Sequence, residues 1–244
     1  MRYVLSWFRS LGIVAFALSI GTTVFVASHS TVEAARPAPA PVEKFELFRG
    51  RARVIDGDTI DVGTTRVRLE GIDAPENGQT CHRRLIGSWP CGYAATTHLA
   101  KLIDGKDVEC QNRGLDKYGR TLGICTFGTI DISAAMVSEG LAWAFVKYSK
   151  LYLPQEAEAR SAKRGIWETD NMPAWDYRAK AWDVADDKAP DGCAIKGNVG
   201  RNGLIYHMPW SPWYGRIRMD GSGKRWFCSE NEAVAAGWRA AYTR

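Results

Sequence analysis

The spacing of apolar and polar residues predicts short strands followed by short helices. Alternating apolar residues, separated by tight DGD and GTT turns, predict a three-stranded meander, and two further strands follow it. These strands are expected at 51–55, 59–62, 66–72, 107–111 and 121–126. Helical spacing predicts helices at 93–102, 131–139 and 154–163, and 141–145 is a short apolar segment. Five strands with interposed helices indicate a mainly β, α+β fold: a five-stranded barrel of the oligonucleotide-binding (OB) class with about three helices.

A separate pattern of glycine and aromatic residues begins at Cys193. It predicts a small β-rich module over 193–244, closed by a short helix at 230–236. Residues 171–192, whose second half is rich in Asp, Lys and Pro, are expected to be a linker, which leaves 45–170 for the barrel domain. Four aromatic residues are expected to form the module's own core, the alternative being a base-stacking or wall-binding face. They are Trp210, Trp213, Tyr214 and Trp226.

The first 35 residues have the pattern of an export signal. A short basic start precedes an uncharged apolar run at 11–27, and small residues follow up to Ala35. The alternative is a retained signal anchor, since the run is at the short limit for a membrane span. Residues 36–44 form a Pro/Ala linker. The expected location is therefore periplasmic or secreted, with membrane anchoring if the signal stays uncleaved.

Six cysteines in an exported chain indicate disulfides rather than free thiols. Zinc binding is disfavoured, because no two of the cysteines form a CxxC pair. The pairs that we predict are Cys81–Cys91, Cys110–Cys125 and Cys193–Cys228.

Composition narrows the function less than the motifs do. The hydrophobic content of 45% and the charged content of 24% are ordinary for a soluble globular protein. The net charge of +5 favours polyanionic partners only mildly, since many proteins with this charge bind no nucleic acid.

Acidic residues at the ends of predicted strands point to phosphodiester chemistry. Asp58 and Asp73 offer hard oxygen ligands for Ca²⁺ or Mg²⁺, and Asp56 is expected to join or support them. Glu76 follows a proline that fixes its backbone, which suits a general base. Each residue alone has an ordinary explanation; Asp-Gly-Asp, for example, is usually a hairpin turn. Their weight comes from occurring together.

Basic and aromatic residues complete this set. Arg68 and Arg120 carry planar guanidinium groups that match two phosphate oxygens and would clamp a phosphoryl transition state. Lys117 is expected to steer the nucleic-acid backbone, and Tyr118 to bond a terminal phosphate or stack beneath a base.

The motifs VIDGDTIDV, RLEGIDAPE, DKYGR and SEGLAW together resemble the staphylococcal nuclease (thermonuclease) family over 51–167. The resemblance implies an OB barrel that uses Ca²⁺ and cleaves DNA and RNA to leave 3′-phosphate ends. It implies the roles given above, and adds the Thr59 carbonyl as a third metal ligand. DNA and RNA are the expected partners, as substrates of a monomer with no obligate protein partner.

The chain also departs from that family. The loop at 77–91 is different and holds two cysteines, and Ala74 replaces a hydroxyl residue. The second phosphate-binding tyrosine has no certain equivalent, since Tyr148 lies near and Val146 stands at the ungapped position. The C-terminal pattern resembles a module sometimes called a sunset domain. Two alternatives stay open: a non-catalytic nucleic-acid-binding OB-fold protein, and an envelope-associated binding factor.

Overall fold

A computed structural model describes residues 45–241, except Ile86 and Lys117. These residues belong to the compact unit Glu43–Arg244. The expected signal segment and Pro/Ala linker lie outside the described residues, and so does Lys117.

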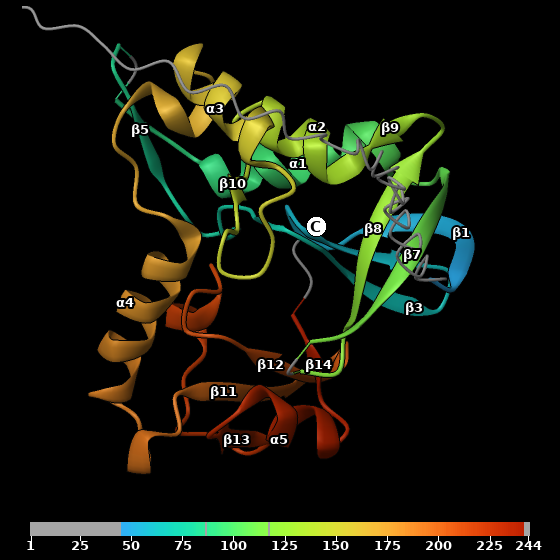
Figure 1. The fold of residues 1–244 in the computed structure, drawn as a ribbon. Coiled ribbons are helices and arrows are strands. Elements are labelled where there is room, and N and C mark those ends of the chain that lie inside the picture. Colours follow the sequence, from blue (N-terminus) through green and yellow to red (C-terminus); the bar gives the residue numbers. More distant parts are fainter. Residues whose placement is uncertain (1–44, 86, 117, 242–244) are drawn as a thin grey trace, which may run out of the picture. The chain divides into compact units, whose positions relative to one another are not determined.

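Five strands close into the barrel that the alternating pattern predicts (Figure 1). They are β1 (Leu47–Val54), β2 (Thr59–Val62), β3 (Thr65–Leu69), β7 (Asp107–Leu115) and β8 (Thr121–Phe127). The antiparallel order is β3-β2-β1-β7-β8, and a parallel pairing of β3 with β8 closes the ring, with Val67 opposite Thr121. The short strand β9 (Ile130–Asp131) extends the sheet beyond β8. The α+β, OB-type fold is therefore confirmed.

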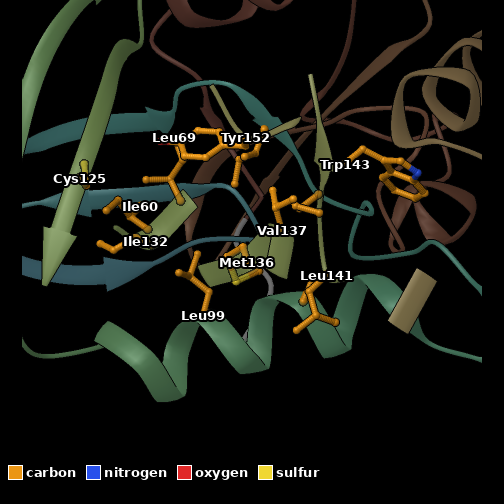
Figure 2. Close-up of a cluster of buried hydrophobic side chains, with 14 of the residues drawn as sticks. Ile60, Leu69, Leu99, Cys125, Ile132, Met136, Val137, Leu141, Trp143 and Tyr152 are labelled. Atoms are coloured by element: carbon orange, nitrogen blue, oxygen red, sulfur yellow. The ribbon is translucent and has the colours of Figure 1, made fainter. Parts of the chain in front are cut away.

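Three helices lie close to their predicted positions: α1 (Cys91–Ile103), α2 (Ile132–Ser138) and α3 (Leu153–Ser161). Asp131 caps α2, because its side chain accepts a hydrogen bond of 2.9 Å from the Ala134 amide. Figure 2 shows Leu99 of α1 and Met136 of α2 among the buried side chains that fill the barrel, next to Ile60 and Leu69. Burial of this apolar surface holds the helices on the barrel.

A two-stranded ribbon extends from the barrel toward the candidate site. Strand β4 (Ile72–Asp73) pairs with β10 (Trp143–Ala144), and Asp73 lies opposite Trp143. The pairing anchors the backbone of Asp73, which therefore does not sit on a free loop.

Part of the expected linker is helical. Residues 174–186 form α4 (Ala174–Asp186), and its first turn packs on the core of the barrel. The Trp175 ring stacks on Phe145 with centroids 5.4 Å apart and meets Trp143 edge-on at 6.1 Å. The division of the chain at 170 and 193 stays a prediction. Short 3-10 helices lie at Gly165–Glu168, Pro190–Gly192 and Tyr214–Arg216.

The C-terminal segment forms a four-stranded sheet and one helix. Its strands are β11 (Ile195–Gly200), β12 (Gly203–His207), β13 (Lys224–Phe227) and β14 (Arg239–Ala240), and its helix is α5 (Glu230–Ala235). The order in the sheet is β13-β11-β12-β14.

The core predicted for this segment is wrong. The buried residues are Ile195, Tyr206, Phe227, Ala233 and Trp238. Trp226 precedes Phe227 on the same strand and so faces the other side of the sheet, because successive strand residues alternate. The remaining three lie between β12 and β13, and Trp213 is 40% exposed.

All three predicted disulfides are present. Cys110 and Cys125 face each other across β7 and β8. Cys81 starts the hairpin of β5 (Cys81–Arg83) and β6 (Gly87–Trp89), and its bond to Cys91 ties that hairpin to α1. Among the helices of the described segments, none is long and apolar enough to span a membrane.

Candidate active site

One cleft of about 970 Å³ gathers most of the residues that the motifs single out. Its lining includes Asp56, Thr59, Arg68, Glu76, Tyr118 and Arg120. It also includes Arg178 of α4, which no motif indicated. Met208, Trp210 and Pro212 of the C-terminal segment line it as well, which adds apolar surface to a charged cleft.

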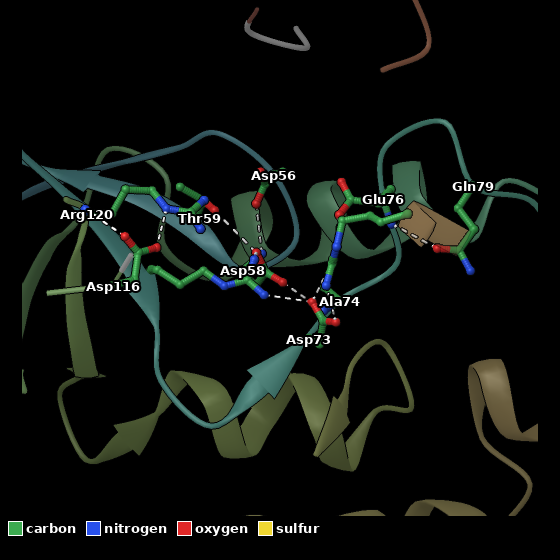
Figure 3. Close-up of polar contacts among 11 residues, drawn as sticks. Asp56, Asp58, Thr59, Asp73, Ala74, Glu76, Gln79, Asp116 and Arg120 are labelled. Atoms are coloured by element: carbon green, nitrogen blue, oxygen red, sulfur yellow. Dashed lines mark hydrogen bonds and ion pairs between the residues drawn. The ribbon is translucent and has the colours of Figure 1, made fainter. Parts of the chain in front are cut away.

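Two turns bring Asp58 and Asp73 close together (Figure 3). Asp58 lies just before β2, and its backbone amide donates to the Asp56 carboxylate at 3.1 Å. A second hydrogen bond comes from Ala74, whose amide donates to the Asp58 carboxylate at 2.8 Å. Because Ala74 follows Asp73 directly, this bond fixes Asp73 beside Asp58.

Acidic and basic side chains then alternate in what we call the charge row: Asp58, Arg68, Asp73, Arg178 and Glu76. Arg68 pairs with Asp58 and donates to Asp73 at 2.7 Å. Arg178 donates to both oxygens of Asp73, at 3.0 and 2.7 Å, and to Glu76 at 2.7 Å. Asp58 and Asp73 are 3% and 0% exposed, so their bonds to the arginines lie away from bulk water. Burial raises the pKa of Asp58 to about 8, while the nearby Arg68 acts in the opposite direction.

Glu76 sits in a loop that Gln79 holds in place. The Glu76 amide donates to the Gln79 side chain at 3.1 Å, and the Gln79 amide donates back to the Glu76 carbonyl at 2.7 Å. The buried Gln79 also donates to the Met172 carbonyl at 2.7 Å. Burial raises the pKa of Glu76 to about 7, while the nearby Arg178 acts in the opposite direction. A carboxylate with this pKa can accept and release a proton near neutral pH.

Arg120 also lines the cleft, but Asp116 holds it in place rather than the charge row. Its guanidinium donates to Asp116 at 2.7 Å, and the backbone amides of Tyr118 and Arg120 both donate to the same carboxylate at 2.9 Å. The Arg120 guanidinium lies 5.3 Å from the centre of the Tyr118 ring. Asp116 therefore aims both residues. Arg120 lines the cleft together with Arg68, Arg178 and Glu76 of the charge row. Figure 3 shows Arg120 and Asp116 on one side of Asp58 and Glu76 on the other.

The oxygen atoms of Asp58 and Asp73 suit a hard cation. The carbonyl of Thr59 suits it least, because it already accepts the amides of Ile55 at 3.0 Å and Asp56 at 3.2 Å. Over the described residues no group of three or more His, Cys, Asp or Glu side chains is placed to hold a metal. A cation here would therefore combine two carboxylates with backbone and water oxygens, as Ca²⁺ and Mg²⁺ commonly do.

Arg178 and Gln79 of the site were given no role from the sequence, and Asp116 opens the DKYGR motif but was given no role there either. One signal for Arg178 exists in the sequence, because Ala174, Arg178, Ala181 and Ala185 recur at helical spacing. That spacing predicts a helix with Arg178 on its alanine face, but it does not say what the arginine meets.

Comparison with known proteins shows the family of the chain. A family model described as staphylococcal nuclease homologue matches residues 66–169. A protein named micrococcal nuclease from Shigella flexneri is 38% identical over 150 residues, which cover 54% of this chain and 80% of the relative. The chain belongs to the staphylococcal nuclease family. A protein named uncharacterized endonuclease from Escherichia coli O157:H7 is 37% identical over 146 residues, which cover 57% of this chain and 89% of the relative.

The two ends of the described chain match different family models. A second family model, ArfC, matches residues 176–240, which include most of α4 and the C-terminal sheet. A protein named succinoglycan biosynthesis protein ExoI, from Rhizobium meliloti, is also similar, at 35% identity over 50% of this chain and 65% of its own length. Arg178 thus lies beyond the part that the staphylococcal nuclease model matches.

Proposed function

We propose that this member of the staphylococcal nuclease family is a cation-dependent nuclease that hydrolyses phosphodiester bonds of DNA and RNA. The observation that carries the proposal is one cleft lined by Glu76, Arg68 and Arg120, in which Arg68 is paired with both Asp58 and Asp73. Acids that can hold a cation and accept a proton lie there beside guanidinium groups that can bind phosphate.

The proposed roles follow from the position of each group. Glu76 accepts a proton from the attacking water, for which its raised pKa is suited. Arg68 and Arg120 neutralise the phosphoryl oxygens as negative charge builds up on them. A Ca²⁺ ion at Asp58 and Asp73 would supply further positive charge to the phosphoryl group. Asp56 keeps the turn of Asp58 in place through its bond to the amide.

Substrate binding is assigned to the rim of the cleft. Tyr118 and Arg120 form a pair that can hold a terminal phosphate, with Lys117 beside them in the sequence. These groups recognise the nucleic-acid backbone rather than base edges, so little base specificity is expected. Release of 3′-phosphate ends is part of the proposal and rests on the family resemblance.

Location and assembly are part of the same proposal. Three disulfides form readily only in an oxidising compartment, which supports a periplasmic or secreted protein. We expect a monomer whose partners are its nucleic-acid substrates.

The test is turnover of single-stranded DNA by the purified protein with Ca²⁺, with and without a chelator. Glu76→Gln should lower kcat/KM by about 10²–10⁴, since it removes the proton acceptor and keeps the shape of the side chain. Glu158→Gln is the matched control, because Glu158 is exposed on α3. DNA binding without cleavage by the unaltered protein would favour the non-catalytic alternative. Full activity of Glu76→Gln would exclude Glu76 as the base.

A further inference from the structure

Arg178 is the least expected member of the charge row. Its guanidinium makes three bonds of 2.7–3.0 Å to Asp73 and Glu76, and its side chain is 21% exposed. The residue comes from α4, in the segment that the ArfC family model matches. A side chain from outside the matched nuclease segment therefore reaches the two acids on which the proposed chemistry depends.

The packing of α4 fixes this arrangement. Ala174 is fully buried, and Trp175 stacks against Phe145 one turn before Arg178. Tyr177, the residue immediately before Arg178, donates through its hydroxyl to the Gly78 carbonyl at 3.2 Å. The helix is thus attached both to the core of the barrel and to the loop that follows Glu76. Arg178 enters the site from a docked helix, so its backbone is already ordered when its side chain bonds to the acids.

The bonds between Arg178 and Asp73 indicate the role of Arg178 in the site. Asp73 is completely buried, and each of its oxygens accepts a bond from Arg178. Arg68 occupies one of those oxygens as well. A divalent cation that uses Asp73 as a ligand must share or replace these bonds, and it would meet two like charges within a few ångströms.

We propose that Arg178 is the internal counter-ion of the cation site: it holds Asp73 and Glu76 in position without a cation and lowers the affinity for one. Binding of the ion then requires Arg178 to release Asp73, while its bond to Glu76 can keep the base aligned. Arg178 is a positioning residue in this scheme. The inference rests on the proposed function only in placing the cation at Asp58 and Asp73.

The direct test is calorimetric titration of the full chain with Ca²⁺ alone, at fixed pH and ionic strength. Arg178→Gln should bind Ca²⁺ at least about tenfold more tightly than the unaltered protein, because one positive charge at the site is removed. Arg178→Lys keeps the charge but not the planar fork, and should fall between the two. Lys180→Gln removes the same charge from an exposed position on α4 and should change the affinity by less than about twofold.

Thermal unfolding gives a second measurement that does not depend on catalysis. In chelator, Arg178→Gln should melt below the unaltered protein, because Asp73 loses a partner in a buried site. Saturating Ca²⁺ should then raise its Tm by more than it raises that of the unaltered protein. If the role of Arg178 is purely structural, the substitution should lower the Tm in chelator and the Tm in saturating Ca²⁺ by the same amount, and the affinity for Ca²⁺ should not change.

The outcomes separate this inference from the function on which it rests. If the unaltered protein binds Ca²⁺ and cleaves DNA, but Arg178→Gln binds Ca²⁺ no more tightly than Lys180→Gln, only the counter-ion role is refuted. A raised KM for DNA in Arg178→Gln at unchanged Ca²⁺ affinity would also refute it, and would make Arg178 a phosphate ligand. If neither the unaltered protein nor Arg178→Gln binds Ca²⁺, both the proposed cation site and the counter-ion role fail.

Discussion

Gly57 lies between Asp56 and Asp58, and a methyl group at this position would act on the whole site. Its backbone conformation is open to alanine, so the obstacle is space alone. A Cβ atom on Gly57 would lie 2.7 Å from the Cβ of Ala74 and 3.0 Å from the Cβ of Ala95, where ordinary contacts begin at 3.4 Å. Ala74 and Ala95 are both buried, so neither can move toward solvent.

The expected cost of Gly57→Ala can be worked from these distances. The turn must move away from Ala74 by about 0.7 Å, and overpacking of this kind costs about 1–3 kcal/mol. Alanine restricts the unfolded chain, which returns roughly 0.4–1 kcal/mol. The net loss of about 1–2 kcal/mol corresponds to a fall in Tm of roughly 2–8 °C. Because the shift separates Asp58 from Ala74, we also expect kcat/KM on single-stranded DNA to fall about tenfold or more.

The control for this substitution is Gly215→Ala. A Cβ atom there would have no neighbour within 4 Å, and its backbone is also open to alanine. Melting curves and initial rates at saturating Ca²⁺ would be compared for both variants. The reasoning is refuted if Gly57→Ala melts at or above Gly215→Ala and retains the kcat/KM of the unaltered protein.

Three further predictions concern the ionisable groups of the cleft. The kcat/KM should fall as the pH drops below about 7, because burial raises the pKa of Glu76 and only its ionised form accepts a proton; Arg178→Gln should move this limb to higher pH, since the guanidinium favours the carboxylate. A pH profile of initial rates measures both the fall in kcat/KM and its shift. If the acid limb of the profile lies at the same pH in Arg178→Gln as in the unaltered protein, the predicted shift is wrong. Asp116→Asn keeps an acceptor for the turn amides but loses the ion pair with Arg120, so kcat/KM should fall roughly tenfold with little change in Tm. Circular dichroism melts and initial rates test it, and an unaltered rate would show that Arg120 needs no such support.

Local patterns in the sequence determined the elements of this protein and most of its reactive groups. Alternating apolar residues marked β2 and β8, and helical spacing marked α1 to within two residues at either end. These features depend on how often apolar residues recur along the chain, every second residue in a strand and every three to four in a helix, and this repeat can be read without the rest of the fold. Motifs likewise indicated Asp58, Asp73, Glu76 and the two arginines, because each lies within or close to a short predicted strand.

Only the tertiary structure decided which distant groups meet. The pairing of β3 with β8 closes the barrel across about fifty residues of sequence, and no local period encodes it. Trp226 and Phe227 are adjacent aromatic residues, and only the packing of the sheet decided that Phe227 is the buried one. Arg178 meets Asp73 because Trp175 docks α4 on the barrel, more than a hundred residues along the chain. The acids and Arg68 were therefore predictable from their own neighbours, whereas the second counter-ion, Arg178, depended on how a remote helix packs.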